Sequence, residues 1–172
     1  NDEYWMDTTL HELGHAIYDK NIDKALPFII RDTAHIFVTE AIAMLFGRQS
    51  KNIQFVKNYF EISEDKAKKL SQEISNSLRL KQLVFSRWAQ VMFYFEKEIY
   101  KNPEQDLNKL WYGIINKYQL LNFSRDFPDW ASKIHLVSSP AYYHNYLLGE
   151  MLASQLHHKI TKDILEQNSL KN

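Results

Sequence analysis

The chain contains very few residues that interrupt a helix: only four glycines and four prolines occur among its 172 residues. These two residue types are the least favourable inside a helix, by about 1 and 3 kcal/mol relative to alanine. The polar–apolar alternation that is typical of strands is scarce, whereas apolar residues recur at helical spacing along most of the chain. The sequence therefore predicts an all-α protein.

No internal repeat, low-complexity tract or long linker divides the chain, so we predict one all-α unit over residues 1–172. The longest predicted helix includes a run from Leu80 to Phe95 that is apolar on nearly every side, which is typical of a buried helix. Trp88, Phe93 and Phe95 are therefore expected in the core. The predicted helices span about residues 4–20, 28–47, 50–60, 63–101, 104–119 and 140–166.

Charge and composition exclude several classes of partner. The 21 basic and 21 acidic residues balance, which argues against a nucleic-acid or anionic-membrane surface as the main partner. Cysteine is absent, so disulfides and thiolate chemistry are excluded while the compartment stays open. No apolar run approaches the ~20 residues of a membrane span, and the first residues lack signal-peptide regions. Because the chain does not begin with Met, we expect a fragment of a longer protein.

The stretch TTLHELGHAIYD places His11 and His15 four residues apart, with Glu12 directly after the first. On a helix this spacing puts both imidazoles on one face. Zinc in hydrolases typically has three protein ligands plus water, so the motif supplies two ligands and a general base, Glu12. Gly14 costs about 1 kcal/mol in a helix but admits another backbone or a substrate. The alternative is a surface helix with this spacing by chance.

Glu40 is the candidate for the third metal ligand. It stands in AHIFVTEAIAMLFG, where nearly every neighbour is apolar. An unpaired buried charge is costly, so this carboxylate needs a partner or a metal. In the alternative, Glu40 lies on a polar stripe with Thr33 and Gln49. The sequence thus predicts a Zn²⁺ site formed by His11, His15 and Glu40.

The remaining histidines differ in their surroundings. We expect His35 in the core or beside the ligands, and His157 and His158 on the surface. His135 stands in a loop-like stretch whose neighbours can hydrogen-bond an oxyanion or a carboxylate, so it is either part of a substrate-binding wall or an isolated loop histidine. These neighbours are Lys133, Tyr142, Tyr143 and Tyr146.

Taken together, the motifs resemble the angiotensin-converting-enzyme-like peptidyl-dipeptidases and, more distantly, the thimet oligopeptidase family. The resemblance covers residues 11 to about 150. It rests on HELGH, on LPFIIR followed by TEAIA, on LNKLWYGIINKYQ and on KIHLVSSPAYYHNYLL. Both families are all-helical zinc peptidases with a glutamate ligand. The resemblance therefore implies the catalytic half of a longer enzyme, whose N-terminal half supplies the other wall of the cleft.

The resemblance also implies a role for each candidate residue. Glu12 would activate the attacking water, and the zinc ligands would be His11, His15 and Glu40. His135 would hydrogen-bond the substrate backbone and Lys133 would hold a C-terminal carboxylate, which is an anion.

The families also carry two tyrosines three residues apart. One binds the C-terminal carboxylate of the substrate, and the other donates its hydroxyl to the tetrahedral oxyanion. Counting without gaps from the histidine gives Tyr142 and Asn145. One inserted residue gives Tyr143 for substrate binding and Tyr146 for catalysis. We choose this second pair because it keeps both phenols.

Other positions depart from the family pattern. Met44 stands where converting enzymes carry an aspartate, so the histidines must be oriented by another group, such as Asp7 or Asp32. Ile115 and His144 replace arginines of the chloride-activated members, so chloride activation is not expected.

The sequence predicts a zinc-dependent metallopeptidase that hydrolyses oligopeptides with a free C-terminus, of the peptidyl-dipeptidase or oligopeptidase type. The expected partners are the peptide and the N-terminal half of the same protein, without which this chain should bind metal but cleave slowly. Two alternatives remain: a zinc hydrolase with a non-peptide substrate, against which Lys133 and the tyrosines argue, and a non-catalytic helical zinc-binding module.

Overall fold

The computed structural model describes residues 2–166, and every regular element in this range is helical, which confirms the all-α prediction. It consists of two compact units. Unit 1 contains residues 2–76 and 148–166, and unit 2 contains residues 77–147. Two helices, α4 (Glu64–Lys101) and α7 (His144–Lys159), contribute residues to both units. Within the described range, no helix combines the length and apolar character that a membrane crossing requires.

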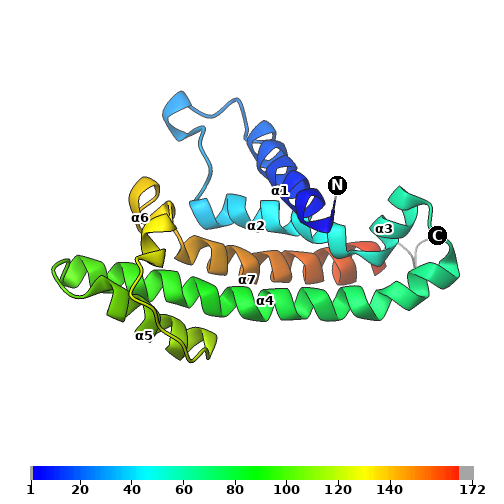
Figure 1. Ribbon diagram of the computed structural model, residues 1–172. Coiled ribbons are helices and arrows are strands. Elements are labelled where there is room, and N and C mark those ends of the chain that lie inside the picture. The colour runs from blue at the N-terminus through cyan, green and yellow to red at the C-terminus, as the bar shows by residue number, and fades with distance from the viewer. Residues whose placement is uncertain (1, 167–172) are drawn as a thin grey trace. The chain divides into compact units, whose positions relative to one another are not determined.

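Unit 1 is built around the contact between its first two long helices (Figure 1). In addition to parts of α4 and α7, it contains α1 (Glu3–Lys20), the 3-10 turn η1 (Phe28–Ile30), α2 (Ile36–Gly47), the 3-10 turn η2 (Arg48–Lys51), α3 (Ile53–Phe60) and the π-helical segment η4 (Ile160–Glu166). Side-chain caps define two of the starts. The Asp2 carboxylate accepts the Trp5 N–H at 3.1 Å at the start of α1, and Asn52 accepts the Gln54 N–H at 3.0 Å at the start of α3. These bonds satisfy amides that have no partner within the helix.

The backbones of α1 and α2 meet at Gly14. A methyl carbon placed on Gly14 would lie 2.6 Å from Ala43 Cα and 3.1 Å from the Ile42 carbonyl oxygen. Ala41 and Ala43 are completely buried. The sequence-based expectation that Gly14 admits another backbone is therefore confirmed, and the helix with the HELGH motif packs on the helix that carries Glu40.

The part of α7 that belongs to unit 1 packs against α2 in a similar way. A methyl carbon on Gly149 would lie 3.0 Å from Glu40 Cβ. Farther along α7, the Arg48 Nη2 donates to the Glu150 carbonyl and to Ser154 Oγ, both at 2.9 Å, and also pairs with the Glu150 carboxylate. The α7 backbone therefore covers Glu40.

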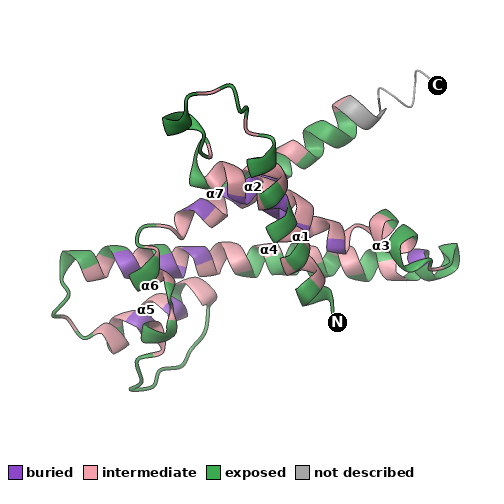
Figure 2. Cartoon of the chain, turned by 90° about the horizontal axis from the view of Figure 1, so that it is seen from above, coloured by how far each residue is buried: buried purple, intermediate pink, exposed green. Residues whose placement is uncertain are grey.

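Unit 2 has its own apolar core between α4 and α5 (Leu107–Gln119) (Figure 2). The rings of Phe95 and Trp111 pack edge to face at 4.8 Å, a favourable aromatic geometry. A segment with the 3-10 turn η3 (Asp129–Ser132) leads to the short helix α6 (His135–Ser138). The buried core residues are Val91, Met92 and Phe95 of α4 and Trp111, Tyr112 and Ile115 of α5.

The second helix begins later than the sequence predicts, at Ile36 instead of residue 28. The Asp32 carboxylate accepts the Thr33 N–H at 2.7 Å, a local bond that competes with helix formation. His35 then caps α2 by accepting the Phe37 N–H at 3.3 Å. His35 is exposed, so its predicted place in the core is wrong.

Two other helix starts are also later than predicted. The fifth helix begins at Leu107 because Asp106 accepts the Lys109 N–H at 2.9 Å as its N-cap. The last helix begins at His144, not at residue 140, because Ala141 has a left-handed backbone with φ 54°. A left-handed residue cannot continue a right-handed helix.

The long apolar run of α4 is only partly buried. Phe95 is inaccessible and Trp88 packs half-buried against the core, as predicted. Phe93 is 40% exposed and Leu80 is 62% exposed, so the predicted burial on all sides is wrong. Within unit 2 the buried core residues of α4, Val91, Met92 and Phe95, lie on one face of this helix.

Gly14→Ala is expected to lower the free energy of unfolding by about 1–3 kcal/mol, the usual cost of overpacking a close contact. The matched control is Gly113→Ala. Gly113 is exposed in α5, and its added methyl carbon would meet no atom within 4 Å. This control should raise the free energy of unfolding by about 0.5–1 kcal/mol, because alanine favours helices. Urea unfolding of the metal-free chain measures both, and changes of the same sign would contradict the proposed contact.

Candidate metal centre

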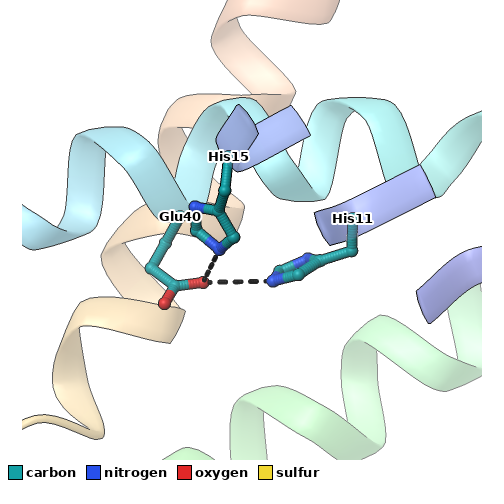
Figure 3. A group of neighbouring side chains, drawn as sticks. All are labelled: His11, His15 and Glu40. Carbon is teal, nitrogen blue, oxygen red and sulfur yellow. Dashed lines mark ion pairs between the residues drawn. The ribbon is translucent and has the colours of Figure 1, made fainter. Parts of the chain in front are cut away.

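The structure brings the three predicted metal ligands together (Figure 3). His11 and His15 come from successive turns of α1, and Glu40 comes from α2. Glu40 Oε2 lies 3.5 Å from His11 Nε2 and 3.8 Å from His15 Nε2. One ligand atom from each residue can be chosen so that all three lie within 4.8 Å of one another.

Helix geometry and the α1–α2 contact explain this convergence. The two histidines share a face of α1, where their rings pack edge to face at 4.9 Å. Glu40 stands three residues before Ala43, so both lie on the face of α2 that meets α1 at Gly14. The same close packing therefore brings the carboxylate within reach of both imidazoles.

Both separations are longer than a direct hydrogen bond, and the 3.5 Å separation lies within the range expected for two ligands of one zinc ion. Two ligands of a tetrahedral zinc ion, each about 2.0–2.2 Å from the metal, lie roughly 3.3–3.6 Å apart. A direct N–H···O bond would require about 2.7–3.2 Å. The donor set, two imidazoles and a carboxylate, is also one that catalytic zinc sites use. The residues present thus fit a zinc ion.

Burial differs between the carboxylate and the histidines. The Glu40 side chain is 3% exposed, whereas those of His11 and His15 are 24% and 25% exposed. Glu40 is therefore not on an exposed polar stripe, the alternative that the sequence left open. A carboxylate buried to this degree needs positive compensation.

The pKa of His11 depends on this environment. Burial by itself lowers the pKa of His11, but the Glu40 carboxylate raises it, with smaller contributions from Glu12 and Asp7. The net effect is a raised pKa. A proton and a metal ion compete for the same imidazole nitrogen, so protonation of His11 opposes metal binding.

Thr39 is a neighbour of the centre that the sequence analysis missed. Its Oγ1 lies 2.7 Å from His15 Nδ1. Asp7 and Asp32 were the groups expected to orient the histidines, but the Asp32 carboxylate instead accepts the adjacent Thr33 N–H. The available signal was a hydroxyl residue directly before Glu40 in an otherwise apolar run.

Glu12 follows His11 on α1 and is exposed. Its carboxylate contributes to the raised pKa of His11, so it acts electrostatically on the candidate ligand. An exposed carboxylate at this position is accessible to water.

The other predicted site residues gather within unit 2. His135 Nε2 and the Tyr146 hydroxyl lie 3.3 Å apart. The Tyr143 ring packs against the rings of His135 at 5.0 Å and of Tyr146 at 5.1 Å. The Lys133 ammonium lies 5.4 Å from the centre of the Trp88 ring, within the range of a cation–π interaction. Unit 2 thus presents an imidazole, phenols and an ammonium group on neighbouring residues.

The two possible tyrosine pairs have different environments. Asn145 is buried, and its amide donates to the Tyr142 carbonyl at 3.0 Å. Tyr146 is half-buried beside His135. The Tyr143 hydroxyl accepts the Trp88 Nε1–H at 2.7 Å. Burial raises the pKa of Tyr143, and the hydrogen bond from Trp88 has a smaller, lowering effect on that pKa. The choice of the pair with two phenols, Tyr143 and Tyr146, stays a prediction.

A buried carboxylate holds the segment before these tyrosines. Glu96 is 8% exposed and accepts the Ala141 N–H at 2.5 Å and the Tyr100 hydroxyl at 2.7 Å. These bonds support Ala141 in its left-handed backbone conformation. Sequence reasoning could not find this contact, because residues 96 and 141 are far apart in the chain.

The chain is similar to a protein named Carboxypeptidase 1 from Bacillus subtilis (strain 168). The two are 27% identical over 182 aligned residues, which cover 94% of this chain and 36% of that protein. The chain therefore spans about a third of the length of this relative. No family model and no solved structure matches the chain.

Glu40→Gln is expected to weaken zinc binding at least about tenfold, since losing a ligand should cost no less than losing a group that orients one. The matched control is Glu73→Gln, the same change at an exposed position of α4. Competition with a chromophoric chelator gives the affinity, and elemental analysis gives the stoichiometry. Undiminished zinc affinity in Glu40→Gln would mean that the third ligand lies elsewhere.

Proposed function

We propose that the chain is part of a zinc-dependent metallopeptidase that hydrolyses oligopeptides with a free C-terminus. The observation that carries this proposal is the convergence of His11, His15 and Glu40 in unit 1. The site is open on its histidine side, where the side chains are about a quarter exposed. Such an opening is what a substrate requires.

Zinc bound there would polarise the substrate carbonyl and lower the pKa of the attacking water to about 7. In this proposal Glu12 acts as the general base: it takes a proton from that water and passes it to the leaving amine. Its exposed position directly after His11 supports the role. Proton transfer by a positioned group typically accelerates a reaction by about 10²–10⁴-fold.

The groups of unit 2 are proposed to bind the substrate. Tyr146 and His135 would donate hydrogen bonds to the carbonyl oxygen as it becomes negatively charged. Lys133 and Tyr143 would hold the terminal carboxylate through charge-assisted hydrogen bonds. The contacts of His135 with both tyrosines support a shared task for these groups.

The similarity to a protein named Carboxypeptidase 1 supports a peptidase over a zinc hydrolase with another substrate. The name describes action at a peptide C-terminus, which agrees with a carboxylate-binding role for Lys133. We also propose that another part of the same protein covers exposed apolar side chains, among which Phe28 and Ile29 are 88% exposed. We further propose that this peptidase is of the converting-enzyme or thimet-oligopeptidase type.

A non-catalytic zinc module is the main alternative. Structural zinc sites are almost always closed by four protein ligands. In the part of the chain that the structure describes, the candidate group has three histidine or carboxylate donors. A site with three protein ligands keeps one coordination position for water or substrate, which favours catalysis.

Glu12→Gln is expected to retain zinc and to lower peptide turnover by about 10²–10⁴-fold, because it removes the base and keeps the ligands. The assay uses the full-length protein and a short peptide. Chelation should abolish turnover in the wild type, and added zinc should restore it. Zinc-loaded Glu12→Gln with wild-type turnover would rule out the proposed base, and wild-type turnover without metal would rule out the metallopeptidase.

Tyr146→Phe is expected to lower kcat about 100-fold or more with little change in KM, because its hydroxyl acts on the transition-state oxyanion. Lys133→Ala should instead raise KM for peptides with a free C-terminus and leave C-terminally amidated peptides unchanged. Steady-state kinetics with both peptides separates the two effects. A large kcat defect in Asn145→Ala, with a normal Tyr146→Phe, would show that the choice of tyrosine pair is wrong.

A further inference from the structure

The imidazole of His15 is contacted at both nitrogens by consecutive residues of α2. Its Nε2 lies 3.8 Å from Glu40 Oε2, and its Nδ1 lies 2.7 Å from Thr39 Oγ1. The first separation is too long for a hydrogen bond and close to the spacing of two ligands of one zinc ion, whereas the second is a hydrogen bond. Thr39 and Glu40 therefore act on opposite edges of one ring.

We propose that Thr39 is the positioning residue that orients His15 for zinc, an inference that rests on the metal centre proposed above. The His15 Nε2 must be free of its proton to bind a metal, so the neutral ring carries its proton on Nδ1. Nδ1–H then donates to Thr39 Oγ1, which accepts with a lone pair. The bond selects the tautomer and the orientation that the ligand needs.

Thr39 is suited to this role by its position. It belongs to the same helix as Glu40, so the helix that supplies the carboxylate ligand also supplies the group that orients the imidazole. The acceptor is half-buried, which limits competition from water. Because a hydroxyl is neutral, it adds no second negative charge beside the buried Glu40 carboxylate.

The other groups considered for this task have different surroundings. Asp32 is exposed and accepts the Thr33 N–H. Asp7 lies beside the end of α2, where its Oδ1 would be 2.5 Å from a methyl carbon placed on Gly47, and it acts on the pKa of His11. Thr39, by contrast, is within hydrogen-bond distance of the His15 ring.

The decisive comparison is Thr39→Val against Thr39→Ser in the full chain. Valine has nearly the shape of threonine but cannot accept a hydrogen bond, whereas serine keeps the hydroxyl. Thr39→Val is expected to bind zinc about tenfold more weakly, the lower end for losing a group that orients a ligand. Thr39→Ser should remain close to the wild type. Thr9→Val, the same change at an exposed position of α1, is the control and should also bind as the wild type does.

Zinc affinity is measured with zinc chloride against a chromophoric chelator. Nitrogen NMR of histidine-labelled, zinc-loaded protein adds a readout that general loosening would not imitate: a hydrogen-bonded His15 Nδ1–H that disappears in Thr39→Val and returns in Thr39→Ser. Urea unfolding of the metal-free variants checks the fold. If the valine variant does not fold, Thr39→Ala takes its place in the comparison.

The results separate this inference from the proposed function. If the wild type binds no zinc at this site, both fail. If the wild type binds zinc and Thr39→Val matches it in affinity and in the Nδ1–H signal, the metal centre stands and the role of Thr39 is overturned. Equal weakening in the valine and serine variants would also overturn it, since the hydroxyl would then not be the cause.

Discussion

The candidate metal centre depends on the close approach of α1 and α2 at Gly14 and Ala43. Gly14 directly precedes His15, and Ala43 stands three residues after Glu40, so the depth of this contact sets the separation of the donor atoms. Helices usually pack about 8–10 Å apart, with the smallest side chains giving the closest approach. Gly149 on α7 brings a third backbone against Glu40. Small residues thus bury a carboxylate that larger residues would displace.

This burial creates the electrostatic demand that the neighbouring side chains meet. A carboxylate as buried as Glu40 must be compensated, and the two histidines are groups that can take a proton or share a cation with it. The Glu40 carboxylate raises the pKa of His11 against the effect of burial, so it favours the protonated imidazole. A bound metal would replace the proton, so acid and metal compete for one site, while Thr39 holds His15 through its other nitrogen.

In unit 2 the polar groups are held in place by hydrogen bonds to a rigid aromatic core. The Trp88 ring packs edge to face on the buried Trp111 at 5.8 Å and donates its N–H to Tyr143. Glu96 holds the backbone at Ala141. Aromatic side chains have few rotatable bonds, so a phenol fixed in this way loses little further entropy when it binds a ligand.

The sequence by itself determined the all-α class and the shared face of His11 and His15. Each follows from composition or from spacing along one helix, which local geometry dictates. Only the tertiary structure decided that Thr39 meets His15, that Glu96 meets Ala141, and that Phe93 remains exposed although Phe95 is buried. Helix periodicity also does not predict where α2 starts, because side-chain hydrogen bonds at its N-terminus compete with the helix. Periodicity specifies which residues share a face of a helix. Which other element covers that face, and how closely, depends on packing between residues that are distant in the chain.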